Sequence, residues 1–175
     1  MSARPKLIAL DLDGTVWTPD MYQLWGGGAP FREGAGDGVL LDRSGQEVRL
    51  LGEVASILHE LQTAEKWQGV HVAWVSCTDE PEWADECLRK FKTTGGQTLH
   101  SVVPAAASMI FKANKQRHFE RLRVQYPLVA FDEMLFFDNE YGNIAAVEKM
   151  GVRAVHCPDG MTLEAWQRGL AMFKK

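Results

Sequence analysis

One short run of residues constrains this chain more than any other feature. The apolar segment Leu7–Leu10 leads directly into Asp11 and Asp13, and Gly14 and Thr15 follow. An uninterrupted apolar run of this length is typical of a strand buried on both faces in a parallel sheet. The two acids then lie at its carboxyl end, where ligands bind in open α/β sheets, and they repel each other unless a cation or a proton lies between them. The run therefore predicts a divalent-metal site with a reactive carboxylate, the alternative being an ordinary Asp-Gly turn.

Length and composition predict one domain over residues 1–175, large enough for a substantial core. The chain is 46% hydrophobic and 24% charged, which argues against disorder. Its formal net charge is −4 and it has no long basic run, which disfavours nucleic acid as a partner.

Three sequence features bear on the compartment in which the protein is located: its cysteines, its N-terminus and its hydropathy. Cys77, Cys87 and Cys157 are an odd, sparse set that gives no disulfide framework, and no Cys or His pair has zinc-like spacing. The N-terminal residues lack the long apolar segment of a signal peptide, and no stretch is long enough to span a bilayer. We therefore expect a cytoplasmic protein without a membrane partner.

Strand and helix patterns alternate along the chain, which predicts an α/β fold with a mainly parallel sheet. We expect strands at residues 7–10, 70–75, 99–103, 134–137 and 152–156. We expect helices from about residue 53, from a capping box at Asp79 and Glu82, over 111–125, over 141–150 and from about residue 162.

The segment between the first strand and the first helix is predicted to be an insertion. Residues 39–41 and 47–50 flank the polar sequence Asp42-Arg43-Ser44-Gly45, which is typical of a hairpin. Because the insertion follows the acidic strand end, we expect it to hang over the site as a small lid.

Two further strand ends carry polar residues. Ser76 follows residues 70–75, where its hydroxyl can donate to an anion or simply cap a helix. Asp138 follows residues 134–137 as Asp11 follows the first strand, and the carboxyl ends of parallel strands meet at one edge. Asp11, Asp13 and Asp138 are therefore the expected oxygen ligands of Mg²⁺, with helix capping as the alternative for Asp138.

A lysine on the expected helix 111–125 is the remaining candidate. Lys115 lies on the apolar stripe of Phe111 and Phe119, where a buried ammonium is unfavourable unless it is paired. It can reach solvent through its flexible stem, or it can point at the acids. Lys112 lies on nearly the same face, and spacing does not decide between the two.

These residues together predict phosphoryl transfer. Asp11 would attack phosphorus to give an aspartyl-phosphate, and Asp13 would protonate the leaving oxygen and then activate water. Ser76 would hold a non-bridging oxygen, while Lys115 and Mg²⁺ would stabilise the charge on the transferring group.

The same residues, in this order, resemble the motifs of the haloacid dehalogenase superfamily of phosphotransferases. Over almost its full length the chain is most similar to the magnesium-dependent phosphatase-1 family. The shared features are Asp-Leu-Asp-x-Thr-x-Trp at residues 11–17, Asp-Arg-x-Gly-Gln at 42–46, Lys-x-x-His-Phe-Glu-Arg-Leu at 115–122, Phe-Phe-Asp-x-Glu-x-x-Asn at 136–143, and Gly160-Met161. This alignment favours Lys115 over Lys112.

The resemblance implies a Rossmann-like, doubly wound sheet, Mg²⁺ and no large cap domain. It implies phosphotyrosine or sugar phosphates, including fructosamine phosphates on glycated protein, as substrates. The sequence departs from the family's motifs at two positions. Asn139 stands where the family usually has a second acid, and Cys77 occupies a substrate-binding position where the family often has Arg. Trp17 and Trp25 can stack on a substrate, although large aromatic side chains beside a glycine-rich loop as often pack locally.

Two other function classes remain open at this point. Asn139 and Cys77 are compatible with a catalytically weakened module that binds phosphate or protein. A phospho-receiver domain also uses acids, a hydroxyl, a lysine and Mg²⁺, but its phosphorylated Asp would come from a later strand than Asp11.

Overall fold

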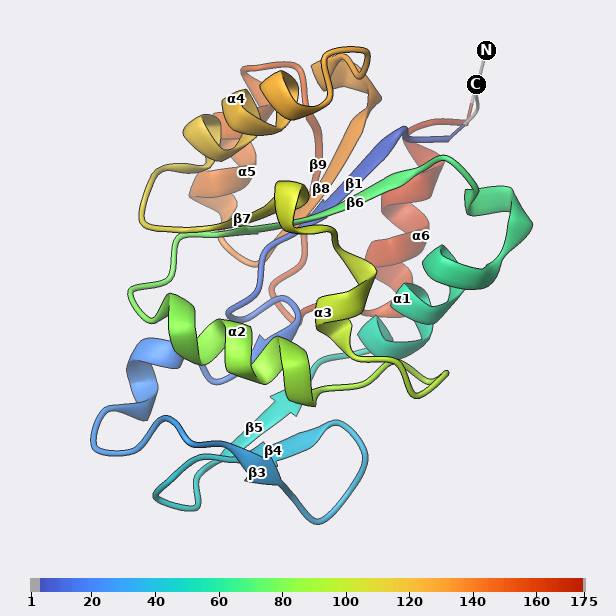
Figure 1. Cartoon of the computed structure of the whole chain (residues 1–175). Helices are drawn as coiled ribbons and strands as arrows, with labels where there is room; N and C mark the ends of the chain where they lie inside the picture. Colours follow the sequence, from blue (N-terminus) through green and yellow to red (C-terminus); the bar gives the residue numbers. More distant parts are fainter. Residues whose placement is uncertain (1–3, 175) are drawn as a thin grey trace.

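The core of the protein is a five-stranded parallel sheet with the strand order β7-β6-β1-β8-β9, seen in a computed structural model that describes residues 4–174 (Figure 1). The strands are β1 (Leu7–Leu10), β6 (His71–Ser76), β7 (Ser108–Ile110), β8 (Met134–Asp138) and β9 (Arg153–His156). The apolar strand β1 lies at the centre, where Leu7 pairs with His71 on one side and Met134 on the other. All residues of β1 are fully buried, so the prediction of a strand covered on both faces is confirmed.

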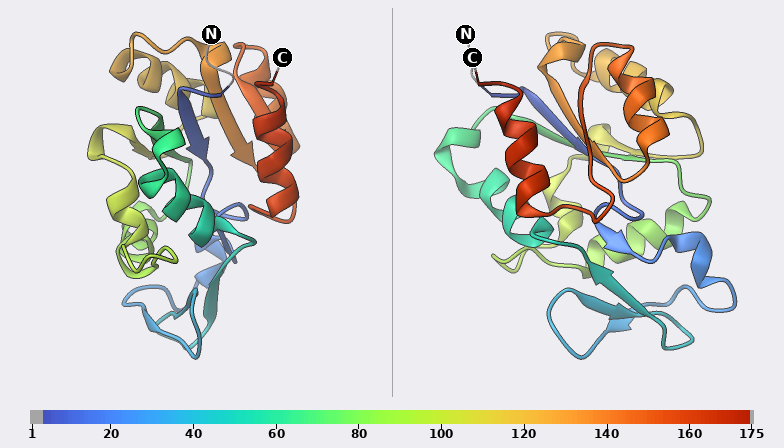
Figure 2. Two further views of the ribbon diagram at one scale, coloured as in Figure 1. Left: turned by 90° about the vertical axis from the view of Figure 1, so that its right-hand side faces the viewer. Right: turned by 180° about the vertical axis from the view of Figure 1, so that it is seen from behind.

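Helices cover both faces of this sheet (Figures 1 and 2). They are α1 (Val54–Thr63), α2 (Pro81–Lys90), α3 (Leu99–Val102), α4 (Lys115–Gln125), α5 (Tyr141–Glu148) and α6 (Leu163–Ala171). Short 3-10 turns occur at η1 (Met21–Leu24), η2 (Glu65–Trp67), η3 (Ala105–Ala107) and η4 (Phe131–Glu133). Helices α4 and α5 lie on one side of the sheet, and α1 and α6 lie on the other, which is the expected doubly wound arrangement.

Local chemistry explains where the helices begin. Asn114 Oδ1 accepts a hydrogen bond from the Arg117 amide (2.9 Å), so α4 begins at Lys115 rather than at residue 111. The capping box expected at Asp79 and Glu82 is wrong, because α2 starts with Pro81 and Glu80 occupies the N-cap without a side-chain bond.

The strand expected at residues 99–103 is also wrong, since residues 99–102 form the short helix α3. Thr98 Oγ1 accepts from the Ser101 amide (3.3 Å), which satisfies the first turn of a helix. The sheet position is taken instead by β7, which the sequence pattern did not reveal and which pairs in parallel with β6.

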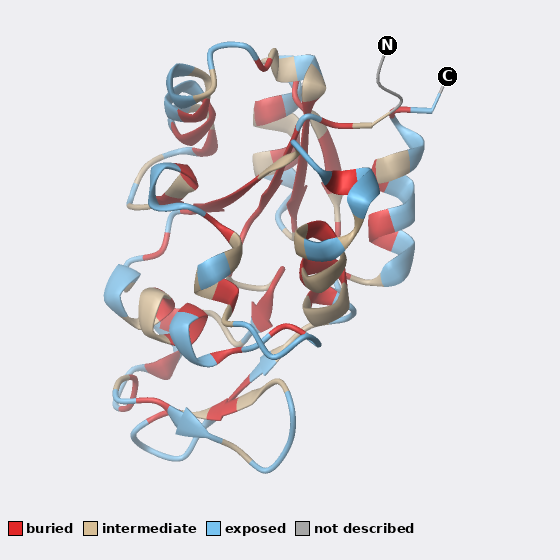
Figure 3. Cartoon of the chain, turned by 45° about the vertical axis from the view of Figure 1, so that its right-hand side comes forward, coloured by how far each residue is buried: buried red, intermediate tan, exposed pale blue. Residues whose placement is uncertain are grey.

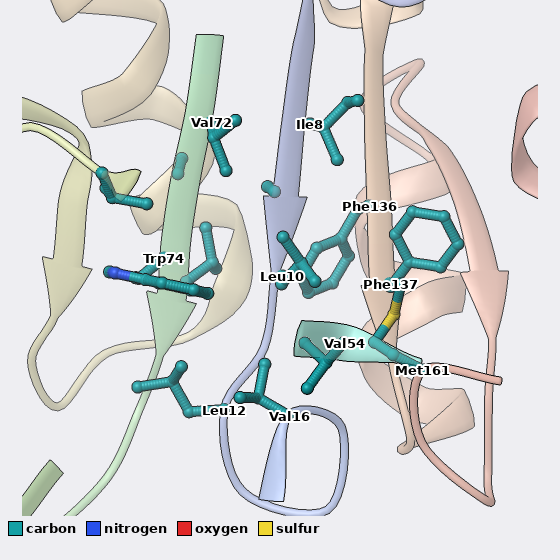
Figure 4. Close-up of a cluster of buried hydrophobic side chains, with 14 of the residues drawn as sticks. Ile8, Leu10, Leu12, Val16, Val54, Val72, Trp74, Phe136, Phe137 and Met161 are labelled. Carbon is teal, nitrogen blue, oxygen red and sulfur yellow. The ribbon is translucent and has the colours of Figure 1, made fainter. Parts of the chain in front are cut away.

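Large apolar side chains from the sheet and its covering helices form one core. Buried residues follow the sheet and the inward faces of the helices (Figure 3), and Figure 4 shows Leu10, Phe136 and Phe137 of the strands beside Val54 of α1. The predicted apolar face of α1 is buried at each of its positions, namely Val54, Ile57, Leu58 and Leu61.

The insertion forms a second, small antiparallel sheet with the order β2-β5-β4-β3, below α2 in Figure 1. Its strands are β2 (Trp17–Thr18), β3 (Arg32–Glu33), β4 (Val39–Leu41) and β5 (Glu47–Leu50), so the predicted hairpin is confirmed. The turn is held by the buried Asp42 carboxylate, which accepts hydrogen bonds from the amides of Gly28 (2.9 Å), Ser44 (2.9 Å) and Gln46 (2.8 Å).

The three cysteines are free. In the part of the chain that the structure describes, no helix has the length and hydropathy that crossing a membrane requires.

Candidate active site

Polar residues lie at the carboxyl ends of three neighbouring strands, and those of two of them, Asp11 and Ser76, line one pocket. Asp11 follows β1, Ser76 ends β6, and Asp138 ends β8, whose neighbour in the sheet is β1. The pocket has a volume of about 170 Å³ and is lined by Asp11, Asp13, Asp20, Tyr22, Ser76, Cys77, Thr78, Asp79, Glu140 and Asn143. Its place at the carboxyl edge of the sheet is where an open α/β fold binds its ligand.

Lys115 reaches this edge from the first turn of α4. Its ammonium Nζ lies 2.6 Å from Asp11 Oδ1 and 3.4 Å from Asp138 Oδ2, and it donates to the main-chain oxygen of Val75 (2.8 Å). The side chain is 1% exposed. Lys112, in contrast, is exposed and pairs with Asp79. The tertiary structure thus brings Lys115, and not Lys112, to the acids.

Burial and charge oppose each other in this cluster. Burial raises the pKa of Asp11 above its ordinary value, although the nearby Lys115 ammonium acts in the opposite direction. Burial alone would lower the pKa of Lys115, but the attraction of Asp11 and Asp138 outweighs it and raises that pKa. Lys115 is therefore a cation beside two buried carboxyl groups, those of Asp11 and Asp138.

Asp13 is held by the insertion rather than by the other acids. Its Oδ1 accepts hydrogen bonds from Trp17 Nε1 (2.8 Å) and from the Met21 amide (3.2 Å). Burial raises its pKa to about 7, with a smaller upward contribution from Asp11 and an opposing one from the Trp17 bond. A carboxyl group with such a pKa can give or take a proton at neutral pH, as acid–base catalysis requires.

Trp17 is not available for substrate stacking, which corrects the substrate-binding role expected for it. The side chain is fully buried and its ring stacks on Phe91, with ring centroids 6.0 Å apart. Trp25 is 87% exposed but does not line the pocket. Trp17 belongs to the core, and its contribution to the site is the hydrogen bond to Asp13.

The three acids do not converge as a three-carboxylate cation site. Within residues 4–174, no group of three His, Cys, Asp or Glu side chains is arranged to hold a metal ion. Asp11 and Asp138 share Lys115, whereas the Asp13 carboxylate turns toward Trp17. Both hydrogen bonds to the Asp13 carboxylate end on Oδ1, so this group does not join Asp11 and Asp138, and its expected role as a ligand stays a prediction.

The segment after β8 is tied to Asp11 through polar side chains. Thr15 Oγ1 donates to Asp11 Oδ2 (3.2 Å) and accepts from the main-chain N–H of Asn139 (3.1 Å). The Asn139 side chain faces two acceptors, so its nitrogen donates to Asp11 Oδ2 (3.2 Å) and to the main-chain oxygen of Asp13 (2.9 Å). Asn143 Nδ2 donates to Asp138 Oδ2 (3.0 Å), which places this residue in an orienting role.

Ser76 and Cys77 occupy the wall opposite this segment. Ser76 is 2% exposed, and Cys77 is exposed, and both line the pocket. Although the residue is exposed, partial desolvation of its sulfur raises the pKa of the Cys77 thiol, so it is a neutral group at physiological pH. A positive charge that an arginine would bring to this position is missing.

The insertion borders the pocket only through its first part, Asp20 and Tyr22. The hairpin does not hang over the acids, which corrects that expectation. It lines a larger groove of about 830 Å³ together with the end of α2 and the segment that follows it, and none of the candidate catalytic residues lines that groove. Pairing of β5 with β2 places the hairpin in the small sheet below α2 in Figure 1.

Sequence reasoning missed two contributors to the site. Tyr22 lies in an irregular segment without periodicity, and no pattern singled it out. Thr15 was part of the initial motif, but its link between Asp11 and residue 139 depends on the pairing of β1 with β8. The adjacency of these strands was the only signal that could have revealed that link.

The donor set fits a hard divalent cation. The carboxylates of Asp11 and Asp138 offer oxygen ligands, and the main-chain oxygen of Asp13 lies 2.9 Å from the same Asn139 side-chain nitrogen that contacts Asp11 Oδ2. Mg²⁺ prefers few protein oxygen ligands and keeps several waters. Burial raises the pKa of Asp11 and, together with the charge of Asp11, raises the pKa of Asp138 to about 7, so a bound cation would favour the ionised form of both acids.

Comparisons with known proteins show the family to which the chain belongs. A family model described as acid phosphatase matches residues 3–175. The chain is 36% identical to human magnesium-dependent phosphatase 1 over all of its length and 90% of that protein. It is 30% identical to a HAD-like hydrolase superfamily protein of Schizosaccharomyces pombe over 85% of its length and 83% of that protein.

Solved structures share the fold. The N-terminal part of a Bacteroides fragilis protein, which contains a phosphatase domain and was solved with Mg, superposes with a TM-score of 0.64 at 19% identity. That match covers 99% of this chain but 42% of the other, so the present chain spans less than half of it. A Corynebacterium glutamicum protein matches over 96% of this chain and 94% of its own, with a TM-score of 0.54 at 12% identity.

Proposed function

The chain belongs to the acid phosphatase family and is a phosphatase, and we propose that its single domain hydrolyses phosphomonoesters with Mg²⁺ through an aspartyl-phosphate on Asp11. The observation that carries this proposal is the buried ion pair between Lys115 and Asp11, whose carboxylate lines the pocket together with Ser76. A carboxylate that is desolvated and paired with a fixed cation is poised to meet a phosphoryl group.

The first half of the reaction breaks the ester. A carboxylate oxygen of Asp11 attacks phosphorus, the bond from phosphorus to the leaving oxygen breaks, and Asp13 gives its proton to that oxygen. The pKa of about 7 at Asp13 supports this role. Lys115 stabilises the charge that spreads over the phosphoryl oxygens, and the Ser76 hydroxyl holds one of them.

The second half restores the enzyme. Asp13, now ionised, takes a proton from a water molecule whose oxygen attacks phosphorus, and the bond to Asp11 breaks to release inorganic phosphate. Asp11 and Asp138, with an oxygen of Asp13, would hold Mg²⁺. When bound, the ion supplies positive charge that offsets the phosphate and the two acids.

We further propose phosphotyrosine or sugar phosphates, including fructosamine phosphates on protein side chains, as substrates. The small size of the insertion supports this range, because just two of its residues, Asp20 and Tyr22, line the pocket in the described chain. A bulky substrate can then present its phosphate without a large cap moving aside. The three free cysteines support a reducing, cytoplasmic location.

The test is turnover of p-nitrophenyl phosphate with Mg²⁺, with EDTA, and in Asp11→Asn. We expect activity that needs Mg²⁺ and falls by at least about 10³-fold in Asp11→Asn. The matched control is Asp132→Asn, because Asp132 is exposed just before β8, at the opposite end of the strand from Asp138. Borohydride reduction of the quenched enzyme and peptide mass spectrometry should locate the phosphorylated residue at Asp11.

The outcomes separate the parts of the proposal. Full activity in Asp11→Asn would remove this nucleophile while leaving the phosphatase in place. Absence of turnover on aryl phosphates, phosphotyrosine peptides and sugar phosphates, all with Mg²⁺, would contradict the hydrolase and favour the phosphate-binding module.

A further inference from the structure

We propose that Tyr22 is a specificity-determining residue of this pocket, its ring forming the wall against which a flat leaving group packs. This inference rests on the proposed phosphomonoesterase function and adds to it the part of the site that meets the leaving group. Tyr22 shares the pocket with Asp11 and Asp13, the proposed nucleophile and proton donor.

Most of the surface of Tyr22 is exposed. In the 3-10 turn η1, Met21 is fully buried and Leu24 is 1% exposed, whereas Tyr22 between them is 61% exposed. Met21 and Leu24 therefore anchor the turn in the core, and Tyr22 lines the pocket. Burying a large aromatic side chain against a ligand would contribute favourably, since Tyr offers a large amphipathic surface.

The turn that carries Tyr22 is fixed directly to the proposed catalytic group. The amide of Met21, adjacent in sequence, donates to Asp13 Oδ1, the same atom that Trp17 Nε1 contacts. At its start, the Asp20 amide donates to Gln23 Oε1 (2.9 Å), and the Gln23 amide donates to the Asp20 main-chain oxygen (2.9 Å). These bonds set the position of the Tyr22 backbone relative to Asp13.

The position of Tyr22 relative to Asp13 determines which part of the substrate its ring can contact. Asp13 protonates the leaving oxygen, so the leaving group must lie next to Asp13 and not beside Ser76 or Lys115. A side chain carried by the residue after Met21 therefore borders the leaving group rather than the phosphoryl group. Asp20 and Glu140 also line the pocket, and both are acidic. Their charge favours an uncharged aromatic leaving group over an anionic one.

The test compares an aryl with an alkyl leaving group in Tyr22 variants. With Mg²⁺ present, kcat/KM is measured for p-nitrophenyl phosphate and for glycerol 2-phosphate. We expect Tyr22→Ala to lower kcat/KM for the aryl ester about three- to tenfold, as loss of one aromatic pair predicts, and to leave the alkyl ester within about twofold. Tyr22→Phe should retain both activities, since the contact is made by the ring.

Trp25 provides the matched control. It is also aromatic and more exposed, it follows the same turn directly, and it does not line the pocket. Trp25→Ala should leave both esters unchanged. Thermal unfolding of each variant shows whether the turn has kept its fold, and a Tyr22→Leu variant repeats the test with a large non-aromatic side chain.

Several results would overturn the inference. Equal losses on both esters in Tyr22→Ala, no loss on either, or a loss in Tyr22→Phe as large as in Tyr22→Ala would each exclude a ring contact with the leaving group. Failure of the wild-type enzyme on both esters would instead count against the proposed function itself.

Discussion

The indole of Trp17 donates a 2.8 Å hydrogen bond to Oδ1 of Asp13, so a fully buried residue of the core aims the carboxyl group that faces the pocket. The bond joins the first residue of β2 to the turn after β1. It also holds the pKa of Asp13 below the value that burial and neighbouring acids would otherwise give it.

Replacing Trp17 by Phe should lower kcat about tenfold and change KM little. The ring can still pack near Phe91, but Asp13 loses a charge-assisted bond, which is worth about 1.5–3 kcal/mol, and about 1.4 kcal/mol of this in the barrier is tenfold in rate. Steady-state kinetics with an aryl phosphate measure the effect. In an Asp13→Asn background the same change should have no further effect on kcat.

Trp67 gives the control for that variant. Its Nε1 also donates to a carboxylate, Glu60 (3.0 Å), and its side chain is also buried, but both residues lie outside the pocket. Trp67→Phe should reduce stability without changing kcat. Equal kcat values for Trp17→Phe and the wild type would show that the indole bond does not position Asp13.

The fold and the position of the acids could be predicted because they follow from short, regular patterns. The apolar run before Asp11 specified a buried parallel strand, and a similar run specified β8 before Asp138. The rule that carboxyl ends of parallel strands share one edge then brought these acids together. The fold class, the hairpin and the face of α1 followed from periodicity in the same way.

The remaining features depend on contacts that spacing does not encode. Lys112 and Lys115 lie three residues apart on nearly the same face, and the choice between them depends on the Asn114 cap and on which ammonium meets Asp11. Substrate contact and local packing both stayed open for Trp17, because an aromatic side chain in an irregular segment gives no sign of its burial. The same irregularity concealed Tyr22.

Replacing Lys115 by Met should remove activity and destabilise the protein. Met has a similar length, but it leaves Asp11 and Asp138 buried without their cation, and breaking a buried pair costs about 3–5 kcal/mol. Activity should fall by at least about 100-fold, since a donor to the transferring group is lost. Urea unfolding and kinetics measure the two effects.

Lys112→Met is the control, because Lys112 is exposed and pairs with Asp79, which lines the pocket, rather than with Asp11 or Asp138. It should leave stability unchanged and lower activity far less than Lys115→Met does. A Lys115→Met protein with wild-type stability would show that the buried acids are not held by that ammonium.

Replacing Asn139 by Asp should reduce the Mg²⁺ concentration needed for half-maximal activity. The side-chain nitrogen of Asn139 donates to Asp11 Oδ2 and to the Asp13 main-chain oxygen. Aspartate at this position would therefore replace a neutral donor by a negative charge beside the proposed ligands. One added charge a few ångströms from the ion contributes at least ~1 kcal/mol, which is about fivefold. Mg²⁺ titrations of activity, after removal of metal with EDTA, give the midpoint.

Asn114→Asp makes the same chemical change at the exposed N-cap of α4, where Asp caps as well as Asn. Its Mg²⁺ midpoint should match that of the wild type. A midpoint for Asn139→Asp that is unchanged or higher would mean that residue 139 does not influence the cation.

Asp42 should make the stability of the protein depend on pH in the acid range. Burial alone would raise the pKa of its carboxyl group, but hydrogen bonds from Gly28, Ser44 and Gln46 outweigh burial and hold the pKa below its ordinary value. The unfolded chain then binds a proton more readily than the folded one. The stabilisation is therefore complete above the ordinary carboxyl pKa, and it is lost as the pH falls through the lower pKa of the folded state.

Asp42→Asn should accordingly be about 2 kcal/mol less stable than the wild type at pH 7, and the difference should shrink as the pH falls below about 4. Urea unfolding at pH 7, 4 and 3 measures it. Asp37→Asn removes the same charge from an exposed position in the same insertion, and it should stay within about 0.5 kcal/mol of the wild type at pH 7. A difference between Asp42→Asn and the wild type that is constant over this pH range would mean that the hydrogen bonds do not favour the ionised carboxylate, and that the turn is held by packing instead.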